Sequence, residues 1–447
     1  MALRITVIGT GYLGATHAAA MAELGFEVLG LDIVPEKIEM LSAGRVPMYE
    51  PGLEEILQKH VAGIEGSTGR LRFTTSWEEA GTFGDVHFVC VNTPQKHGEY
   101  ACDMSYVDSA FESLAPHLTR PALVVGKSTV PVGSAARLSR RLAELAPAGT
   151  DAELAWNPEF LREGFAVKDT LHPDRIVIGV ESERAEKTLR EVYAGPVAEG
   201  SPFVVTDFPT AELVKTSANS FLATKISFIN AMAEVCEAAD GDVVKLAEAI
   251  GHDERIGKKF LRAGVGFGGG CLPKDIRAFM ARAGELGADQ ALTFLREVDS
   301  INMRRRGHMV ELAREAVGGG SFLGTRVAVL GATFKPDSDD VRDSPALNVA
   351  GQIHLQGGQV TVFDPKGMEN ARKLFPTLGY AETALDAVRG ADVVLHLTEW
   401  REFRELDAVA LGEAAGRRII LDGRNALDPE VWREAGWTYR AMGRPKA

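Results

Sequence analysis

The sequence predicts an α/β protein in which two doubly wound domains are joined by a helical domain with a long central helix. Three observations predict this class: a strand, glycine turn, helix and strand at the N-terminus, a long helical stretch in the middle, and a later echo of the first pattern. The 447 residues suit two or three domains. We expect them at residues 1–202, 203–320 and 321–447.

The first expected domain opens on a buried parallel strand at residues 4–8, which are rich in β-branched side chains. Gly9, Gly11 and Gly14 follow in a GxGxxG pattern, and Asp32 ends the next strand. This is the dinucleotide-binding fingerprint in its full context, so a Rossmann-like domain is predicted. Strand patterns at DVHFVCVNTP and ALVVGKSTVPVG continue the alternation.

The glycine turn would bring backbone amides and a helix N-terminus against a pyrophosphate, which the helix dipole favours. Asp32 would bond the ribose hydroxyls and repel a 2′-phosphate, which favours NAD over NADP, although Lys37 weakens that preference. The alternative is a glycine turn that binds no ligand.

The middle and the end of the chain follow different patterns. Residues 210–240 form one long helical stretch, and helical sequence continues to about residue 317. After a glycine- and serine-rich linker, RVAVLGAT, QVTVFDP, ADVVLHLTEW and RRIILDGRN repeat the alternation of the first domain. This second copy lacks GxGxxG, so it should bind something other than a second dinucleotide, or bind it differently.

Composition excludes several classes of protein. A net charge of −13 argues against nucleic acid or an anionic membrane as the main partner. The four cysteines, Cys90, Cys102, Cys236 and Cys271, show no CxxC spacing, which predicts neither a metal site nor a disulfide framework. They fit a reducing, cytoplasmic setting. No apolar run approaches the ~20 residues that span a bilayer.

The segment GVGFGGGCLPKD, residues 264–275, places five glycines just before Cys271. Glycine this dense marks a close approach or an unusual turn. Pro273 suits the first turn of a helix, so Cys271 would lie near a positive helix end, and Lys274 adds charge. Both favour the thiolate. A buried inert thiol is the alternative, which suits Cys90 and Cys236 better.

Two polar pairs at helical spacing are further candidates. Lys215 and Asn219 lie four residues apart on the long helix and share a face, and Glu159 and Glu163 lie four apart in WNPEFLREG. Taken alone, the first pair also fits a solvated polar stripe and the second fits surface carboxylates.

An alcohol dehydrogenase needs no cysteine. A thiol becomes useful when the first product is an aldehyde that must itself be oxidised, because a thiohemiacetal can lose a second hydride and become a thioester. The combination therefore predicts a four-electron oxidation of a primary alcohol to a carboxylate, with two NAD consumed.

The whole chain resembles the UDP-glucose/GDP-mannose dehydrogenase family. The motifs that carry the resemblance are GVGFGGGCLPKD, NPEFLREG, ELVKTSANSFLATKISFIN, VNTP, STVPVG, FKPDSDDVRDSP and DGRN. The stretch FLATKISFIN is more similar to the UDP-glucose branch than to the GDP-mannose branch. Two positions depart from the family pattern: Gly270 stands where serine is usual, and Ala231 where glutamate is common.

The resemblance implies functional residues in every section. Cys271 would be the nucleophile, with Lys215, Asn219 and Asp275 around the reacting carbon, and Thr129 and Glu159 would assist proton transfer. The residues implied at NAD are Gly9, Gly11, Leu13, Gly14, Asp32, Lys37, Thr93, Thr129, Glu163, Lys274 and Arg342. The residues implied at the nucleotide sugar are Glu159, Phe160, Leu161, Arg162, Glu163, Lys215, Asn219, Arg255, Phe260, Leu261, Arg262, Ala263, Gly264, Gly268, Lys335 and Arg424.

The implied reaction is the oxidation of UDP-glucose to UDP-glucuronate for polysaccharide biosynthesis, by a homodimer built on the helical middle. Oxidation of GDP-mannose is the first alternative. A two-electron hydroxy-acid dehydrogenase would leave Cys271 and the last domain without a role. A redox sensor that binds NAD would leave Glu159, Lys215, Asn219 and Asp275 without one.

Overall fold

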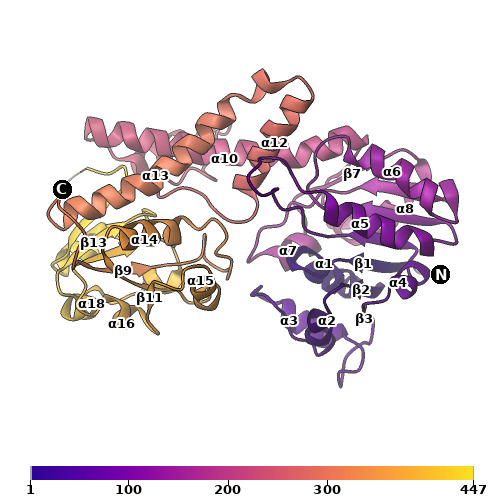
Figure 1. The fold of residues 1–447 in the computed structure, drawn as a ribbon, viewed down its shortest axis with the longest axis horizontal. Coiled ribbons are helices and arrows are strands. Elements are labelled where there is room, and N and C mark those ends of the chain that lie inside the picture. The colour runs from indigo at the N-terminus through magenta and orange to yellow at the C-terminus, as the bar shows by residue number, and fades with distance from the viewer. Residues whose placement is uncertain (1–2, 446–447) are drawn as a thin grey trace. The chain divides into compact units, whose positions relative to one another are not determined.

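The computed structural model describes residues 3–445, which group into two compact units. The first unit extends to residue 218 and includes residues 277–286, and the second holds residues 219–276 and 287 onward. Each unit contains one large sheet (Figure 1). The expected fold class is confirmed, whereas the expected boundaries at 202 and 320 stay a prediction.

The first unit is built on an eight-stranded sheet in the order β3-β2-β1-β4-β5-β6-β7-β8. Its strands are β1 (Arg4–Ile8), β2 (Glu27–Leu31), β3 (Leu71–Thr74), β4 (Val86–Val89), β5 (Ala122–Gly126), β6 (Ala152–Trp156), β7 (Ile176–Val180) and β8 (Phe203–Thr206). Neighbours pair in parallel except β6 with β7, which are antiparallel. The helices are α1 (Tyr12–Glu23), α2 (Pro35–Ser42), α3 (Leu53–His60), α4 (Trp77–Phe83), α5 (Ser105–Leu114), α6 (Ser134–Leu145), α7 (Ala166–Leu171), α8 (Glu183–Val192) and α9 (Ala194–Ala198).

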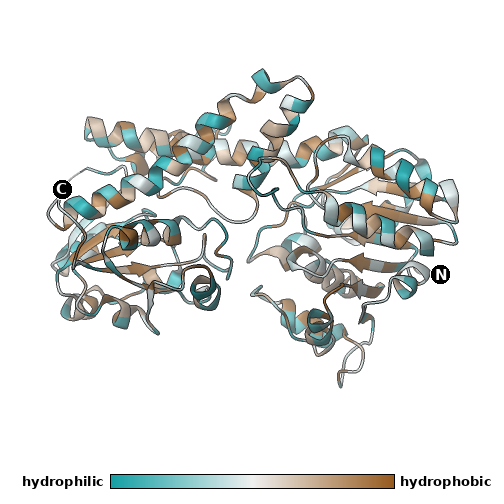
Figure 2. Ribbon diagram, in the orientation of Figure 1, coloured by the Kyte–Doolittle hydropathy of each residue, from teal (hydrophilic) through white to brown (hydrophobic). Residues whose placement is uncertain are grey.

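The central strands of this sheet are hydrophobic on both faces; Figure 2 draws them mostly in brown, whereas the helices mix teal, white and brown. Val7 and Phe88 pack into one core cluster, and Ile8 and Val89 pack into another. The strand order reverses between β1 and β4, so their carboxyl ends flank the crevice where doubly wound sheets bind ligands. The glycine turn directly follows β1.

The second unit contains a parallel six-stranded sheet in the order β11-β10-β9-β12-β13-β14. Its strands are β9 (Arg326–Leu330), β10 (Gln359–Phe363), β11 (Gly379–Tyr380), β12 (Val393–His396), β13 (Ile419–Asp422) and β14 (Thr438–Ala441). Its helices are α14 (Pro345–Leu355), α15 (Met368–Leu374), α16 (Ala384–Val388), α17 (Arg401–Arg404), α18 (Ala408–Ala414) and α19 (Pro429–Glu434). The predicted echo of the first sheet is confirmed.

In the sequence between β8 and β9, the regular elements are helices. The long helix α10 (Phe208–Ala239) matches the expected 210–240 closely, and α11 (Val243–Gly251), α12 (Leu272–Glu285) and α13 (Phe294–Ala316) follow. Within residues 3–445, no helix is long and apolar enough to cross a membrane. The same residues contain no cluster of His, Cys, Asp and Glu that could hold a metal ion.

Candidate active site

The glycine turn after β1 has the geometry that a dinucleotide requires. Gly9 has a φ of +84°, and a Cβ at Gly14 would lie 1.8 Å from the Gly9 carbonyl oxygen, so both positions need glycine for internal reasons. A Cβ at Gly11 would meet nothing within 4 Å. Gly11 is also the N-cap of α1 and offers no side-chain cap to the helix amides. The turn therefore leaves an open, positive helix end, which fits a pyrophosphate.

Asp32 lies beside this turn at the end of β2. Its Oδ2 accepts hydrogen bonds from the Thr10 amide (2.9 Å) and hydroxyl (3.2 Å), and its Oδ1 accepts from the Val34 amide (3.1 Å). Lys37 Nζ lies 3.5 Å from Oδ2. The carboxylate is thus held in one orientation at the switch point of the sheet.

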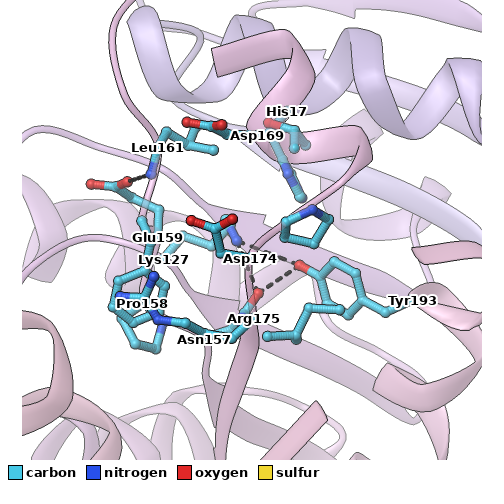
Figure 3. A pocket seen from close by; sticks show the side chains of 14 residues that line it. His17, Lys127, Asn157, Pro158, Glu159, Leu161, Asp169, Asp174, Arg175 and Tyr193 are labelled. Atoms are coloured by element: carbon cyan, nitrogen blue, oxygen red, sulfur yellow. Dashed lines mark hydrogen bonds between the residues drawn. The ribbon is translucent and has the colours of Figure 1, made fainter. Parts of the chain in front are cut away.

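A small cavity under residues 157–161 holds the second group of polar side chains in this unit (Figure 3). Glu159 Oε1 lies 2.9 Å from Lys215 Nζ of α10, and Oε2 accepts from the Leu161 amide at 2.5 Å. Only 15% of the Glu159 side chain is exposed. The surface-carboxylate alternative is therefore wrong for Glu159, and the solvated-stripe alternative is wrong for Lys215, which is buried.

Electrostatics keep Glu159 ionised. Burial by itself would raise the pKa of Glu159, and the charge of Lys215 and its hydrogen bond are the largest influences that oppose burial. The Leu161 amide and the charge of Lys127 act in the same direction, so the pKa of Glu159 lies below its usual value. A buried carboxylate that stays charged at neutral pH is able to accept a proton.

Cys271 lies at the start of α12, as predicted. The helix begins at Leu272, Pro273 is its second residue, and the Asp275 amide donates to the Cys271 carbonyl at 2.9 Å. The Cys271 side chain is exposed, whereas Cys90 and Cys236 are buried. Burial raises the pKa of the Cys90 thiol to about 12, so Cys90 is inert, as the alternative assumed.

A polar cluster of the same unit surrounds the first turn of α12. Asn219 Nδ2 donates to Asp275 Oδ2 at 2.6 Å, and Lys274 Nζ lies 2.6 Å from Oδ1. Asp275 and Asn219 are buried, with 2% and 8% of their surface exposed. Each Asp275 oxygen therefore has a fixed donor, and α10 is tied to the helix that carries the thiol.

The glycines before Cys271 lie against backbone of the same unit. A Cβ at Gly264 would lie 2.4 Å from the Gly423 carbonyl oxygen, and one at Gly268 would lie 2.3 Å from that of Asp343. Arg424 Nη1 donates to the Gly266 carbonyl at 2.9 Å, and its Nε donates to the Leu397 carbonyl at 2.7 Å. The dense glycines predicted a close approach of the backbone to another group, and at Gly264 and Gly268 that group is the protein's own backbone.

Comparison with known proteins decides the family. Sequence profiles of the UDP-glucose/GDP-mannose dehydrogenase family match in three parts: the NAD-binding domain at residues 3–196, the central domain at 209–304 and the UDP-binding domain at 328–429. The chain belongs to this family.

Individual relatives agree with that assignment. A UDP-glucose 6-dehydrogenase of Rhizobium meliloti is 40% identical over 99% of this chain and 100% of its own. The structure of a UDP-glucose dehydrogenase from Pyrobaculum islandicum is similar with a TM-score of 0.89 and 38% identity, over 99% of this chain and 98% of that one. A UDP-D-ManNAc dehydrogenase structure from Pyrococcus horikoshii has a TM-score of 0.86 and 28% identity over 100% of both chains.

Family membership makes the chain an oxidoreductase with NAD as its cofactor, as predicted. The open turn at Gly11 and the oriented Asp32 are where this chain would hold the dinucleotide. Thr93 is buried, and Leu13, Lys37, Thr129 and Glu163 are half-buried in the same unit. Their contacts with NAD, and that of Arg342, stay predictions.

The remaining residues predicted at the nucleotide sugar differ in burial and belong to both units. Phe160 lies with its ring 3.8 Å from the Arg175 guanidinium carbon, and Arg162 pairs with Asp169 at 2.5 Å. Leu261 and Ala263 are buried, Phe260 is exposed with a φ of +63°, and Lys335 lies over the Phe334 ring. Arg262 and Arg255 reach into solvent, where Arg255 pairs with Asp253. Glu159 and Lys215 belong to one unit and Cys271 to the other, so their joint action stays a prediction.

The sequence prediction missed several residues that support the site. Lys127, Asn157 and Tyr193 form a buried network next to Glu159. Asn302 pairs with both the amide and the carbonyl of Phe267 in the glycine loop. A lysine directly after a buried strand was the available signal for Lys127, whereas nothing local marks Asn302 or Tyr193.

Proposed function

We propose that the chain oxidises UDP-glucose to UDP-glucuronate, with two NAD consumed, through a covalent intermediate on Cys271. The observation that carries the proposal is the exposed thiol at the N-terminus of α12, one turn before a buried carboxylate with a fixed donor on each oxygen. The UDP-glucose dehydrogenases named above match the chain over nearly its whole length. The profile of the UDP-binding domain supports a UDP-sugar.

The first half of the reaction gives an aldehyde at C6 of the sugar. NAD, when bound, accepts a hydride in each of the two oxidations. Lys215, one turn from Asn219 in α10, would stabilise negative charge on the sugar oxygen. Thr129, in the loop after β5, and Glu159 would assist removal of the hydroxyl proton.

Cys271 would then carry the second half. Its thiolate adds to the aldehyde carbon, a carbon–sulfur bond forms, and the carbonyl oxygen takes the electron pair. Loss of a hydride converts this thiohemiacetal into a thioester. Glu159 takes a proton from water, the resulting hydroxide attacks the thioester, and the carbon–sulfur bond breaks to return the thiolate and release the carboxylate. Asn219 and Asp275 would order the water and the oxyanion.

We infer in addition that the active form is a homodimer. Phe221, Phe228 and Val235 recur every seventh residue of α10 and are 67%, 48% and 56% exposed. Seven-residue spacing keeps them on one side of the helix, where a second copy would cover them. A molar mass in solution equal to the 48.1 kDa of one chain would contradict this inference.

A nucleotide-sugar panel tests the substrate. Purified protein is incubated with NAD and, in turn, UDP-glucose, UDP-N-acetylmannosamine and GDP-mannose, and NADH is monitored by absorbance. We expect a kcat/KM for UDP-glucose at least about tenfold above the others, since a pocket that discriminates by one polar group reaches that ratio readily. Equal or faster turnover of another sugar would overturn the choice of substrate and leave the covalent chemistry standing.

A further inference from the structure

Lys127 is a buried cation without an anionic partner in hydrogen-bond contact. It follows β5 directly, and only 7% of its surface is exposed. Its Nζ donates to Asn157 Oδ1 at 2.9 Å and to the Tyr193 hydroxyl at 3.4 Å, and it lies 5.7 Å from the centre of the Phe88 ring. None of the ion pairs found within residues 3–445 includes Lys127. A side chain that only filled space here would be apolar, because burying an unpaired charge is costly.

The network fixes Asn157 from three directions. Asn157 Oδ1 accepts from Lys127 and from the Tyr193 hydroxyl (2.6 Å), and its Nδ2 donates to the Val177 carbonyl at 2.8 Å. The Asn157 amide donates to the Gly126 carbonyl at 2.8 Å. In Figure 3, these side chains converge beneath the segment that carries Glu159. Pro158, with its fixed φ, is the only residue between Asn157 and Glu159.

We propose that Lys127 is a positioning residue for Glu159: it anchors Asn157 and, through its charge, holds Glu159 as the carboxylate that activates water. The inference rests on the proposed function, because it assigns Glu159 to thioester hydrolysis. Lys215 binds Glu159 directly, and Lys127 supplies a second positive charge from below. Lys127 itself touches no reacting atom.

The fully buried titratable groups around Lys127 other than Glu159 are neutral near pH 7. Burial lowers the pKa of His17 of α1 well below its usual value, raises that of Cys90 to about 12, and raises that of Tyr193. Asp169, Asp174 and Arg175 also line the cavity and are more exposed. Burial lowers the pKa of Lys127 to about 8, so its charge is present at neutral pH and is lost at more alkaline pH. The buried charged groups here are therefore Lys127 and Glu159, which line the cavity, and Lys215, which pairs with Glu159.

The test compares the pH dependence of kcat for wild type and Lys127→Met with NAD and UDP-glucose. Loss of the positive charge raises the pKa of Glu159, so the acid limb of kcat should move up by about one pH unit. Well below the pKa of Glu159 in both enzymes, kcat should fall about tenfold, and the two enzymes should converge near neutral pH, where Glu159 is ionised in both. Slower hydrolysis should also leave a sugar adduct on Cys271, visible as added mass on the intact protein.

Two further variants separate charge from structure. Lys127→Gln can still donate to Asn157 without a charge, so the same shift of the acid limb is expected, and this variant replaces Lys127→Met if the latter does not fold. Lys59→Met makes the same change at a lysine whose side chain is 56% exposed, and its profile should match wild type. An unmoved acid limb and no adduct in both Lys127 variants would overturn the role of Lys127. A wild type that forms no UDP-glucuronate would instead overturn the proposed function on which it rests.

Discussion

The two sheets of the molecule begin with the same strand–turn–strand arrangement, but the turn is open in the first sheet and filled by protein in the second. In both, a glycine with positive φ follows the first strand, and its amide donates to the last residue of the second strand at 2.8 Å: Gly9 to Leu31, and Gly331 to Phe363. In both, an aspartate follows the second strand and accepts from the turn, at Asp32 and Asp364. The local sequence therefore builds the same corner twice.

What fills the corner differs. In the first sheet, α1 begins three residues after Gly9 and its N-cap, Gly11, faces open space. In the second, α14 begins only at Pro345, and the Ser344 hydroxyl caps it. Trp400 Nε1 donates to Asp364 at 3.0 Å and occupies part of the corner. One sheet thus keeps its turn open for a dinucleotide, and the other closes it with protein.

The carboxyl ends of β5 and β13, the corresponding strands of the two sheets, differ in the same way. Lys127 follows β5 and has only neutral hydrogen-bond partners. In the second sheet, the corresponding strand β13 ends at Asp422, which is fully buried and accepts from His396, Tyr439 and the Leu427 amide. The first sheet thus places a buried cation without an ionic partner at its carboxyl edge, whereas the second sheet hydrogen-bonds its buried carboxylate to a histidine.

The largest effects should come from exchanging glycine for alanine in the two turns. At Gly331, where φ is +117°, a Cβ would lie 2.6 Å from the Thr398 amide nitrogen, so Gly331→Ala should cost about 3 kcal/mol of unfolding free energy. Gly324→Ala is the control, since φ is also positive there but no atom lies within 4 Å, and it should cost about 1 kcal/mol. Thermal and urea unfolding measure both.

Gly11→Ala should leave stability unchanged and weaken NAD binding. The φ of Gly11 is −69° and the added methyl meets no protein atom, so the melting temperature should stay unchanged. The methyl enters the space of the pyrophosphate, so affinity for NAD by titration calorimetry should fall at least about tenfold. Unchanged NAD affinity would show that the open turn is not the phosphate site.

A smaller effect is expected at the two aspartates. Asp32→Ala removes the charge that would face a 2′-phosphate, so the preference for NAD over NADP should narrow about tenfold. We measure kcat/KM for both cofactors. Asp364→Ala is the matched variant in the closed corner and should leave the NAD/NADP ratio unaltered. Equal use of NADP by wild type would contradict the role of Asp32.

The features that could be predicted from the sequence are those that depend on residues close together in the chain. The glycine turn, Asp32, the strand echo and the start of α12 depend on neighbours within a few residues, and all were predicted. The network of Lys127 could not be predicted, because Asn157 and Tyr193 lie 30 and 66 residues from it. The packing of Gly264 in the glycine loop against Gly423 likewise depends on a contact between residues that are far apart in the sequence.

The central claim is the covalent role of Cys271, and counting NADH tests it most directly. Wild type should form two NADH for each UDP-glucuronate, because each hydride needs its own acceptor. Cys271→Ser should bind NAD and UDP-glucose nearly as well but lose steady-state turnover by at least about a thousandfold, since a serine hydroxyl is far less ionised than a thiol and its ester hydrolyses more slowly. Cys102→Ser, at a half-buried cysteine outside this loop, should behave as wild type. Normal turnover and two NADH per product in Cys271→Ser would contradict the claim.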